Sequence, residues 1–231
     1  MSDQKWFPLE SNPQLINSYV EKLGYDTSKY EFVDVLSTED WALGMIPQPV
    51  LAVLLLYPLT EKLTAGEDKS GDENAKQHVW FMKQRIGNAC GTIGLLHVLL
   101  NQTTPEFKDA SWLHQFSNDC PIAMDLIQKA ERLEGDMKIA RFHDEATSSE
   151  ANATNRGSID DRVETHFIGL VYKNDTIYEL DGRKEGPVPH GPTSQETFLT
   201  DAMEVVKTQF MAKDPTELRF TMTALAPKQI S

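Results

Sequence analysis

Apolar residues recur at helical spacing in five stretches of the chain, and the residues at their ends are typical of helix boundaries. The first stretch follows Asn12 and Pro13 and ends before Gly24. Asn is a favourable N-cap, Pro suits the first helical position, and Gly suits the position after the last turn. In the last stretch, Thr193 and Glu196 have the spacing of a capping box. The pattern predicts helices over 13–23, 88–101, 105–116, 121–140 and 193–213.

Short runs rich in β-branched, aliphatic and aromatic residues lie between these helices and predict strands. They cover residues 30–36, 50–57, 78–82, 166–172, 176–181 and 217–225. A tight turn joins the fourth run to the fifth, so these two form a hairpin. Because no internal repeat and no linker divides the chain, we expect residues 1–231 to form one domain that mixes helices and strands.

Two polar segments interrupt this pattern. Residues 65–76 contain Gly and several charged residues, and we expect a surface loop there. Residues 144–163 are more informative, because 144–158 contain no large apolar residue. A structureless loop of about 20 residues is uncommon in a compact domain and is usually either disordered or a functional lid. A plain disordered insertion fits the composition equally well, but the segment leads directly into His166, which favours a lid.

The composition is that of an ordinary soluble globular protein, with 40% hydrophobic and 25% charged residues. The start of the chain has no basic region followed by an apolar run, so we expect no secretory signal. The most apolar stretch, 49–58, is too short to span a bilayer. We therefore expect a soluble cytoplasmic protein, with the nucleus also open to it and no attachment to membranes.

The chain carries 35 acidic and 22 basic residues, a formal net charge of −13. This charge disfavours nucleic acid as a partner, since binding nucleic acid needs a basic surface. It favours a basic partner through steering of the encounter, and acidity that serves solubility alone is an equal alternative. Two cysteines without an export signal argue against a disulfide framework. No CxxC or HExxH motif is present, so we expect no metal and no cofactor.

Cys90 stands at the start of the most apolar of the predicted helices. From 89 to 100 this helix is apolar nearly all round, which places it inside the core. With Asn88 as the N-cap, Cys90 lies in the first turn, where unpaired N–H groups and the helix dipole stabilise a thiolate. Gly91 and Gly94 each cost a helix about 1 kcal/mol relative to Ala. We therefore expect another backbone or a substrate to approach them closely, and Cys90 is the candidate nucleophile.

A thiolate nucleophile needs a base, and the base needs an orienting group. Of the six histidines, His97 lies seven residues beyond Cys90 on the same helix. This separation is roughly 10 Å at 1.5 Å per residue, so His97 is interpreted as a core or groove residue. His166 begins one strand of the hairpin and Asp181 ends the other. His166 and Asp181 lie directly opposite each other if the turn is at 173–174, and they are diagonal neighbours if the turn is one residue later. In either register Asp181 can reach the His166 ring and hold its orientation. A buried structural His–Asp pair is the alternative.

Gln84 precedes Cys90 by six residues, after the predicted 78–82 strand. Its amide can donate to the oxyanion that forms when a thiolate attacks a carbonyl, and the backbone N–H of Cys90 can supply a second donor. The alternative for Gln84 is an ordinary surface residue at a strand end. Cys120 has no paired base in the sequence and is interpreted as a structural thiol.

Residues 84–95, QRIGNACGTIGL, resemble the active-site signature of the ubiquitin C-terminal hydrolases. Three further segments resemble the same family, namely WFPLESNP at 6–13, HFIGL at 166–170 and YELDGR at 178–183. The resemblance covers nearly the whole chain and is closest to the small single-domain members. A twelve-residue signature followed by His and Asp segments in the right order is highly specific.

The resemblance implies a catalytic set in which Cys90 is the nucleophile, His166 the base and acid, Asp181 the orienting acid and Gln84 an oxyanion donor. It implies an α+β fold with papain-like catalytic geometry, in which a central, mostly antiparallel sheet is flanked by helices and the backbone is knotted. It also identifies 144–163 as the crossover loop, which lies over the active-site cleft and limits the size of the leaving group.

The implied activity is that of a monomeric thiol hydrolase that cleaves small or flexible adducts from the C-terminal Gly of ubiquitin, or of a ubiquitin-like modifier, through a Cys thioester. The acidic charge then has a purpose, because ubiquitin is basic around its tail. Arg85 stands where many members have a small hydroxyl residue, a departure that leaves the catalytic set intact. The residues implied to contact ubiquitin are Pro8, Leu9, Glu10, Ser11, Asn12 and Pro13, then Ser149, Glu150, Ala151, Asn152, Ala153, Thr154, Asn155 and Arg156, and finally Glu217, Leu218, Arg219 and Phe220.

Two other functions compete with this one. A non-catalytic protein that holds monoubiquitin has no need of a poised thiol, so the Cys–His–Asp–Gln set argues against it. A thiol acyltransferase or protease of another papain-like family is disfavoured by the 6–13 match and by the absence of a Cys-Gly-Ser-Cys-Trp segment.

Overall fold

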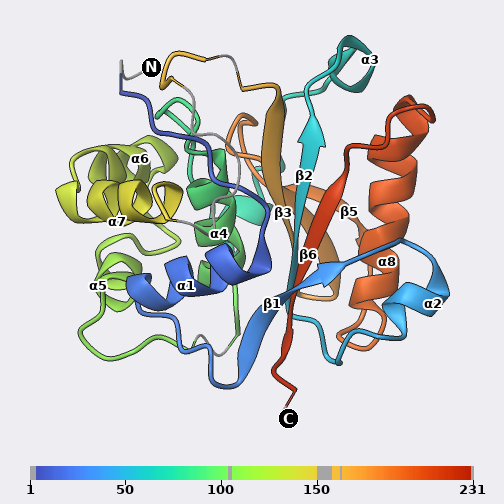
Figure 1. The fold of residues 1–231 in the computed structure, drawn as a ribbon, viewed down its shortest axis with the longest axis horizontal. Helices are drawn as coiled ribbons and strands as arrows, with labels where there is room; N and C mark the ends of the chain where they lie inside the picture. Colours follow the sequence, from blue (N-terminus) through green and yellow to red (C-terminus); the bar gives the residue numbers. More distant parts are fainter. Residues whose placement is uncertain (1–3, 104–105, 150–157, 162, 230–231) are drawn as a thin grey trace.

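A six-stranded antiparallel sheet with the strand order β1-β6-β2-β3-β4-β5 runs through the centre of the computed structural model (Figure 1). The structure describes residues 4–103, 106–149, 158–161 and 163–229. The strands are β1 (Tyr30–Val35), β2 (Ala52–Pro58), β3 (Thr165–Lys173), β4 (Thr176–Leu180), β5 (Val188–Pro192) and β6 (Thr221–Pro227). This is the α+β architecture expected from the sequence.

Helices cover both faces of the sheet. On one side lie α1 (Pro13–Leu23), α4 (Cys90–Leu100), α5 (Trp112–Asp119), α6 (Leu126–Glu134) and α7 (Met137–Thr147), and on the other lie α2 (Asp40–Leu43) and α8 (Phe198–Val205) (Figure 1). Two short helical segments, α3 (Glu61–Thr64) and a 3₁₀ turn (Ala75–Gln77), follow β2. None of the helices within the described part of the chain has the length and apolar character needed to cross a membrane.

The two faces of the sheet build two separate hydrophobic cores. Along β2, Ala52 and Leu54 pack in the core under α1 and α4, whereas Val53 and Leu55 pack in the core under α8. Successive side chains of a strand point to opposite faces, so a strand covered on both faces is a nearly continuous apolar run. This arrangement explains why 50–57 contains no polar alternation.

Several sequence predictions are confirmed. Helix α1 begins after Asn12, whose side chain accepts from the N–H of Gln14 at 2.9 Å, and it ends at Gly24 in a left-handed conformation (φ 107°). The hairpin of β3 and β4 is present, and its turn residues Asn174 and Asp175 both have positive φ. Such a two-residue turn matches the twist of the strands that it joins.

The predicted helix over 121–140 is wrong in its continuity. The chain forms α6 and α7 instead, separated by Gly135 and Asp136. The Asp136 side chain accepts from the N–H groups of Lys138 and Ile139 at 2.9 and 3.3 Å, so it caps a new helix in place of extending the old one. The apolar spacing continues across this break and hides it.

The predicted strand at 78–82 is also wrong. Its backbone bonds to side chains of α4 and the residue after it: Trp80 N–H donates to Asn101 Oδ1 at 2.7 Å, and Met82 N–H donates to His97 Nε2 at 3.2 Å. A segment satisfied in this way needs no neighbouring strand. Strand β5, which pairs with β4 at the edge of the sheet, is not predicted from the sequence. Three of its five residues are Pro or Gly, so it lacks the residue pattern of a strand.

Other boundaries shift as well. The helix expected from 105 begins at Trp112, because Ser111 supplies the N-cap. The helix expected from 193 begins at Phe198, because the Thr193 hydroxyl bonds to Asp201 at 2.7 Å and does not cap the helix. The last turns of this helix, up to residue 213, are irregular. The last strand begins at 221 in place of 217.

Candidate active site

Helix α4 positions Cys90 at its first residue. The N-cap is Ala89 and not Asn88 as expected, because Asn88 adopts a left-handed conformation (φ 61°) that turns the chain into the helix. The next nine residues are all buried, so the helix carries the thiol out of the core with its N-terminal N–H groups around it. A Cβ on Gly91 would lie 2.8 Å from Cβ of Leu9, so the close approach expected at this glycine is made by the N-terminal segment.

The Cys90 thiol and the ring of His166, the second residue of β3, interact electrostatically, and each shifts the pKa of the other. The backbone N–H groups of Gly91 and Phe167 also favour the ionised form of the thiol. Burial alone would raise the pKa of the Cys90 thiol, but His166 and the two N–H groups hold it below its ordinary value. A buried thiol with a lowered pKa is a nucleophile in its thiolate form.

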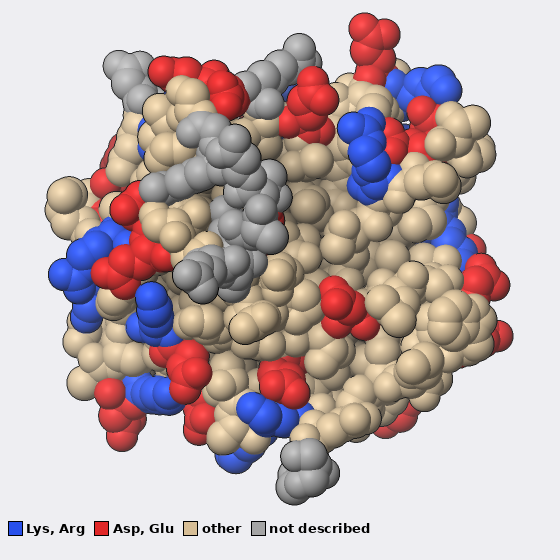
Figure 2. Space-filling view, viewed as in Figure 1, with Lys and Arg blue, Asp and Glu red and all other residues tan. Residues whose placement is uncertain are grey.

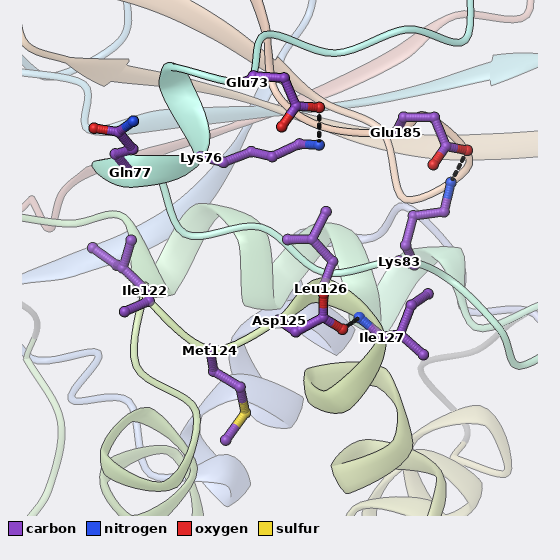
Figure 3. A pocket seen from close by; sticks show the side chains of 11 residues that line it. Glu73, Lys76, Gln77, Lys83, Ile122, Met124, Asp125, Leu126, Ile127 and Glu185 are labelled. Carbon is purple, nitrogen blue, oxygen red and sulfur yellow. Dashed lines mark hydrogen bonds and ion pairs between the residues drawn. The ribbon is translucent and has the colours of Figure 1, made fainter.

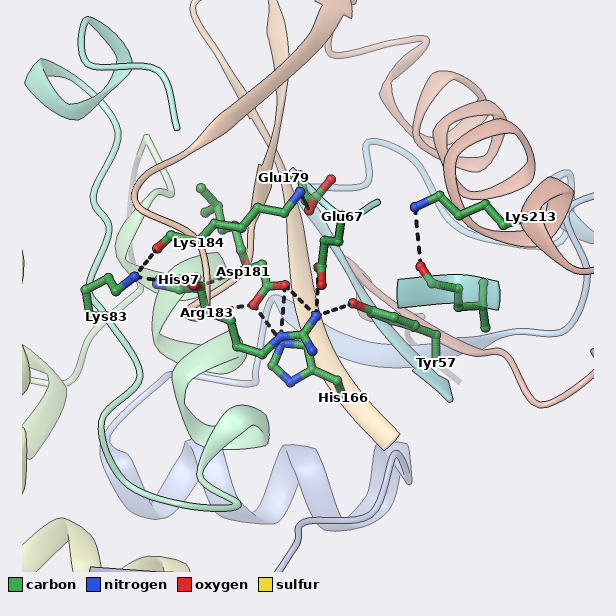
Figure 4. Close-up of polar contacts among 12 residues, drawn as sticks. Tyr57, Glu67, Lys83, His97, His166, Glu179, Asp181, Arg183, Lys184 and Lys213 are labelled. Carbon is green, nitrogen blue, oxygen red and sulfur yellow. Dashed lines mark hydrogen bonds and ion pairs between the residues drawn. The ribbon is translucent and has the colours of Figure 1, made fainter. Parts of the chain in front are cut away.

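Asp181, directly after β4, holds the other side of the His166 ring. Nε2 of His166 donates to Oδ1 of Asp181 at 2.7 Å (Figure 4). Lys173 is paired with Thr176, so the turn of the hairpin is at 174–175. Of the two registers considered from the sequence, this is the one in which His166 and Asp181 are diagonal neighbours. Burial would lower the pKa of His166, but the charge and hydrogen bond of Asp181 together with Cys90 raise it to about 9. The ring is therefore held as an imidazolium beside a thiol whose pKa is lowered.

Sequence reasoning missed Arg183, which holds the far side of the Asp181 carboxylate. Its guanidinium lies 3.1 Å from Oδ2 of Asp181, and its backbone N–H donates to Oδ1 at 2.8 Å. The same guanidinium donates to the Tyr57 hydroxyl at 2.8 Å and to Glu67 at 2.9 Å (Figure 4). Burial raises the pKa of Asp181, but His166 and Arg183 outweigh it and keep the carboxyl ionised. In the sequence, the only indication of this contact is that the basic residue Arg183 follows Asp181 by two positions.

Gln84 lies beside the acid segment, although no strand precedes it. Its backbone N–H donates to the Gly182 carbonyl at 2.8 Å, and its side-chain amide donates to the Ile86 carbonyl at 3.2 Å. A Cβ on Gly182 would lie 2.9 Å from Cβ of Gln84, so this glycine lets the two segments touch. One of the two amide hydrogens of Gln84 is engaged by Ile86, and the other remains able to donate to an oxyanion.

The N-terminal segment packs against the start of α4. Trp6 N–H donates to the Gly87 carbonyl at 2.9 Å, and Nε2 of His143 donates to the Phe7 carbonyl at 2.7 Å. With Nε2 as donor, Nδ1 of His143 accepts from the Thr92 hydroxyl at 2.8 Å. These bonds hold the chain just before 8–13, the segment implied to contact ubiquitin, and within it Leu9 packs against Gly91, next to Cys90.

The other two segments implied to contact ubiquitin are described only in part. Ser149 follows α7, while the implied contacts at 150–156 lie outside the described residues. Residues 217–220 precede β6; the Leu218 side chain is 87% exposed, and Glu217 pairs with Arg219 at 2.7 Å. The first part of the segment predicted as a loop, 144–147, is the last turn of α7.

The remaining candidate thiol and histidine are part of the core. Cys120 is buried, and burial raises its pKa to about 11. His97 is fully buried, donates from Nδ1 to the Leu180 carbonyl at 3.3 Å, and has its pKa lowered by burial to about 4. Neither side chain is poised for chemistry. Within the described ranges, no group of three His, Cys, Asp or Glu side chains is arranged to hold a metal ion.

Comparison with known proteins gives consistent matches over nearly the whole chain. Residues 6–212 match the model of the family described as ubiquitin carboxyl-terminal hydrolase, family 1. A ubiquitin carboxyl-terminal hydrolase of Aplysia californica is 41% identical over 217 residues, 93% of this chain and 98% of the relative. The ubiquitin carboxyl-terminal hydrolase isozyme L1 of Homo sapiens is 39% identical over 223 residues, 94% of this chain and 96% of the relative.

A solved structure has the same fold. It is the UCH37 catalytic domain of Trichinella spiralis bound to ubiquitin vinyl methyl ester, which superimposes with a TM-score of 0.78 at 21% identity and covers 98% of each chain.

Proposed function

The chain belongs to family 1 of the ubiquitin carboxyl-terminal hydrolases, and from this premise we propose how its residues perform the reaction. It is a cysteine-type deubiquitinating hydrolase. The Cys90 thiolate attacks the carbonyl carbon of the C-terminal Gly of ubiquitin, and the carbonyl electron pair moves onto the oxygen. The free amide hydrogen of Gln84 and the N–H of Cys90 donate to this oxyanion.

His166 moves the protons in both halves of the reaction. When the tetrahedral intermediate collapses, the bond to the leaving amine or thiol breaks and the imidazolium gives that group its proton. His166, now neutral, takes a proton from the water that attacks the thioester. The products are the ubiquitin carboxylate and the regenerated thiolate–imidazolium pair.

One observation carries this proposal: His166 donates to Asp181 at 2.7 Å, Arg183 anchors the same carboxylate at 3.1 Å, and His166 so held lowers the pKa of the Cys90 thiol. A protein that only held ubiquitin would need no ionised thiol.

The test is hydrolysis of a fluorogenic ubiquitin C-terminal amide. We expect wild-type protein to turn it over and Cys90→Ala to lose turnover while still binding ubiquitin, because only the nucleophile is removed. Cys120→Ala is the matched control and keeps its activity, since that thiol is outside the site. Binding without turnover by wild-type protein would instead indicate the non-catalytic alternative, and the absence of both would rule out ubiquitin as the substrate.

We propose three contact regions for ubiquitin, namely 8–13, 149–156 and 217–220. In support, Leu9 of the first region packs against Gly91, next to Cys90. Leu218 of the third region is 87% exposed, and three further large apolar residues, Leu36, Trp41 and Met45, are at least 64% exposed. Figure 2 has an area with few charged side chains over β6, α2 and α8. Exposed apolar side chains that gather on one face are typical of a protein-binding surface.

We also propose that the crossover loop, 144–163, restricts the enzyme to small or flexible adducts. A segment lying over the cleft admits an extended chain but excludes a folded protein attached close to the scissile bond. We therefore expect a small ubiquitin ester to be turned over far faster than di-ubiquitin, as measured by initial rates of both at the same enzyme concentration. Comparable rates would show that the loop does not limit the adduct.

A further inference from the structure

A basic groove of about 450 Å³ adjoins Gln84 on the side of Gly182. Four basic side chains line it, those of Lys69, Lys83, Arg85 and Arg183, and no carboxylate does. In a chain with a net charge of −13, such a concentration of cations is against the overall trend.

The carboxylates that pair with these cations lie outside the groove lining. Lys83 pairs with Glu185 at 2.8 Å. Arg85 pairs with Glu131 and Glu134 of α6 at 3.0 and 2.9 Å, and Arg183 pairs with Asp181 and Glu67 at 3.1 and 2.9 Å. Lys69 is exposed and has no ion pair among the residues that the structure describes. Lys69 therefore leaves an unpaired positive charge at a groove that no carboxylate lines, and an anionic group that enters would meet positive charge first.

The basic groove continues into a second groove of about 580 Å³. Both are lined by Lys83 and Ile127, so they meet at these two residues (Figure 3). Beyond this junction the lining includes Ile122, Met124 and Leu126 together with the carboxylates of Glu73, Asp125 and Glu185, and Ile127 is 40% exposed. A chain leaving Gln84 would pass first over the cations and then over a surface of mixed apolar and acidic side chains.

We propose that this path binds the adduct, that is, the part of the substrate that follows the scissile bond, and that it selects adducts with acidic residues next to that bond. This inference rests on the proposed function. Gln84 marks the position of the scissile carbonyl, and neither groove is lined by 8–13 or by 217–220, the segments proposed for ubiquitin. The basic tail of ubiquitin would also be repelled by the basic groove, whereas an acidic adduct would be attracted to it.

The experiment uses ubiquitin extended at its C-terminal Gly by a short unstructured peptide whose first three residues are Asp, Gln or Lys and whose remainder is constant. With wild-type protein at low salt we expect kcat/KM to fall in the order Asp, Gln, Lys, with about a tenfold difference between the first and the last. Lys69→Glu should reduce this ratio at least about threefold.

The matched control is Lys138→Glu, which changes the net charge equally at an exposed residue of α7 that lines neither groove. It should leave the Asp-to-Lys ratio unchanged. A wild-type ratio near one, or an equal change in both variants, would overturn the inference while leaving the proposed function intact. Failure to cleave any of the three extensions, together with no turnover of the fluorogenic amide, would remove the proposed function and this inference with it.

Discussion

At the scale of single residues, the site depends on the negative charge of Asp181, which His166 and Arg183 hold in place. Asp181 binds His166 and the backbone N–H of Arg183 through one oxygen and the Arg183 guanidinium through the other, with the carboxylate itself fully buried. Its negative charge keeps His166 protonated, and protonated His166 in turn lowers the pKa of the Cys90 thiol. The two titrations define the range of pH over which the enzyme is active.

We predict a bell-shaped dependence of kcat/KM on pH. Activity falls on the acid side as the thiolate of Cys90, whose pKa is below its ordinary value, becomes protonated. It falls on the alkaline side near pH 9, where His166 loses the proton that it must donate.

In Asp181→Asn the charge that raises the pKa of His166 is gone, so the alkaline limb should move to lower pH and kcat should fall about a hundredfold or more. The measurement is the pH profile of the fluorogenic amide with both proteins. An alkaline limb that stays in place would show that Asp181 does not set the pKa of His166.

The sequence brings Cys90, His166 and Asp181 to notice because each lies at or next to the end of a regular element. A thiol at a helix start and a His–Asp pair across a hairpin can be recognised from local spacing alone. Arg183 and Tyr57, by contrast, meet across 126 positions of sequence. Contacts of this kind depend on how β2 and β4 are placed on either side of β3, which no local pattern encodes.

At the scale of elements, two of the errors have a common cause. The 78–82 run is apolar enough for a strand, but Asn101 and His97 take its backbone hydrogen bonds. The 121–140 run has helical spacing throughout, but Asp136 restarts the helix. In both cases a polar side chain redirects the backbone, and a pattern of apolar positions does not detect it.

Asp136 also joins three helices, which leads to a stability prediction. It caps α7, accepts from the indole N–H of the buried Trp112 on α5 at 3.0 Å, and pairs with Arg132 of α6 at 2.9 Å. Asp136→Ala removes a cap worth about 1 kcal/mol and leaves a buried N–H without its acceptor, so we expect a loss of about 2–3 kcal/mol in the free energy of unfolding.

The control is Asp125→Ala, which removes the N-cap of α6 and nothing more among the described contacts. It should cost about 1 kcal/mol. Urea unfolding of both variants provides the measurement, and equal losses would show that the Trp112 contact contributes nothing.

At the scale of the whole molecule, charge is distributed unevenly. Acidic side chains are spread around the rim of the face in Figure 2, while the area over β6, α2 and α8 has few charges. The basic groove next to Gln84 is instead lined by positively charged side chains. The acidic surface would attract the basic tail of ubiquitin, and the basic groove would attract an acidic adduct on the other side of the scissile bond.

The net charge of −13 permits a test between steering and solubility, the two roles that the composition leaves open. If the acidic surface steers ubiquitin, salt should screen the encounter, because the Debye length shrinks from about 30 Å at 0.01 M to about 8 Å at 0.15 M. We then expect kcat/KM for the fluorogenic amide to fall several-fold over this range through KM, with kcat unchanged, since the buried ion pair of Cys90 and His166 is shielded from salt.

The rate of Cys90 alkylation by a small neutral reagent serves as the control, because it needs no encounter with ubiquitin and should not respond to salt. A kcat/KM that is constant across the range would assign the acidity to solubility. A fall in kcat with constant KM would mean that salt acts on the catalytic pair itself, contrary to the burial of His166 and Asp181. A salt effect confined to KM would place the acidic charges in the recognition of ubiquitin and leave the chemistry to the Cys–His–Asp chain.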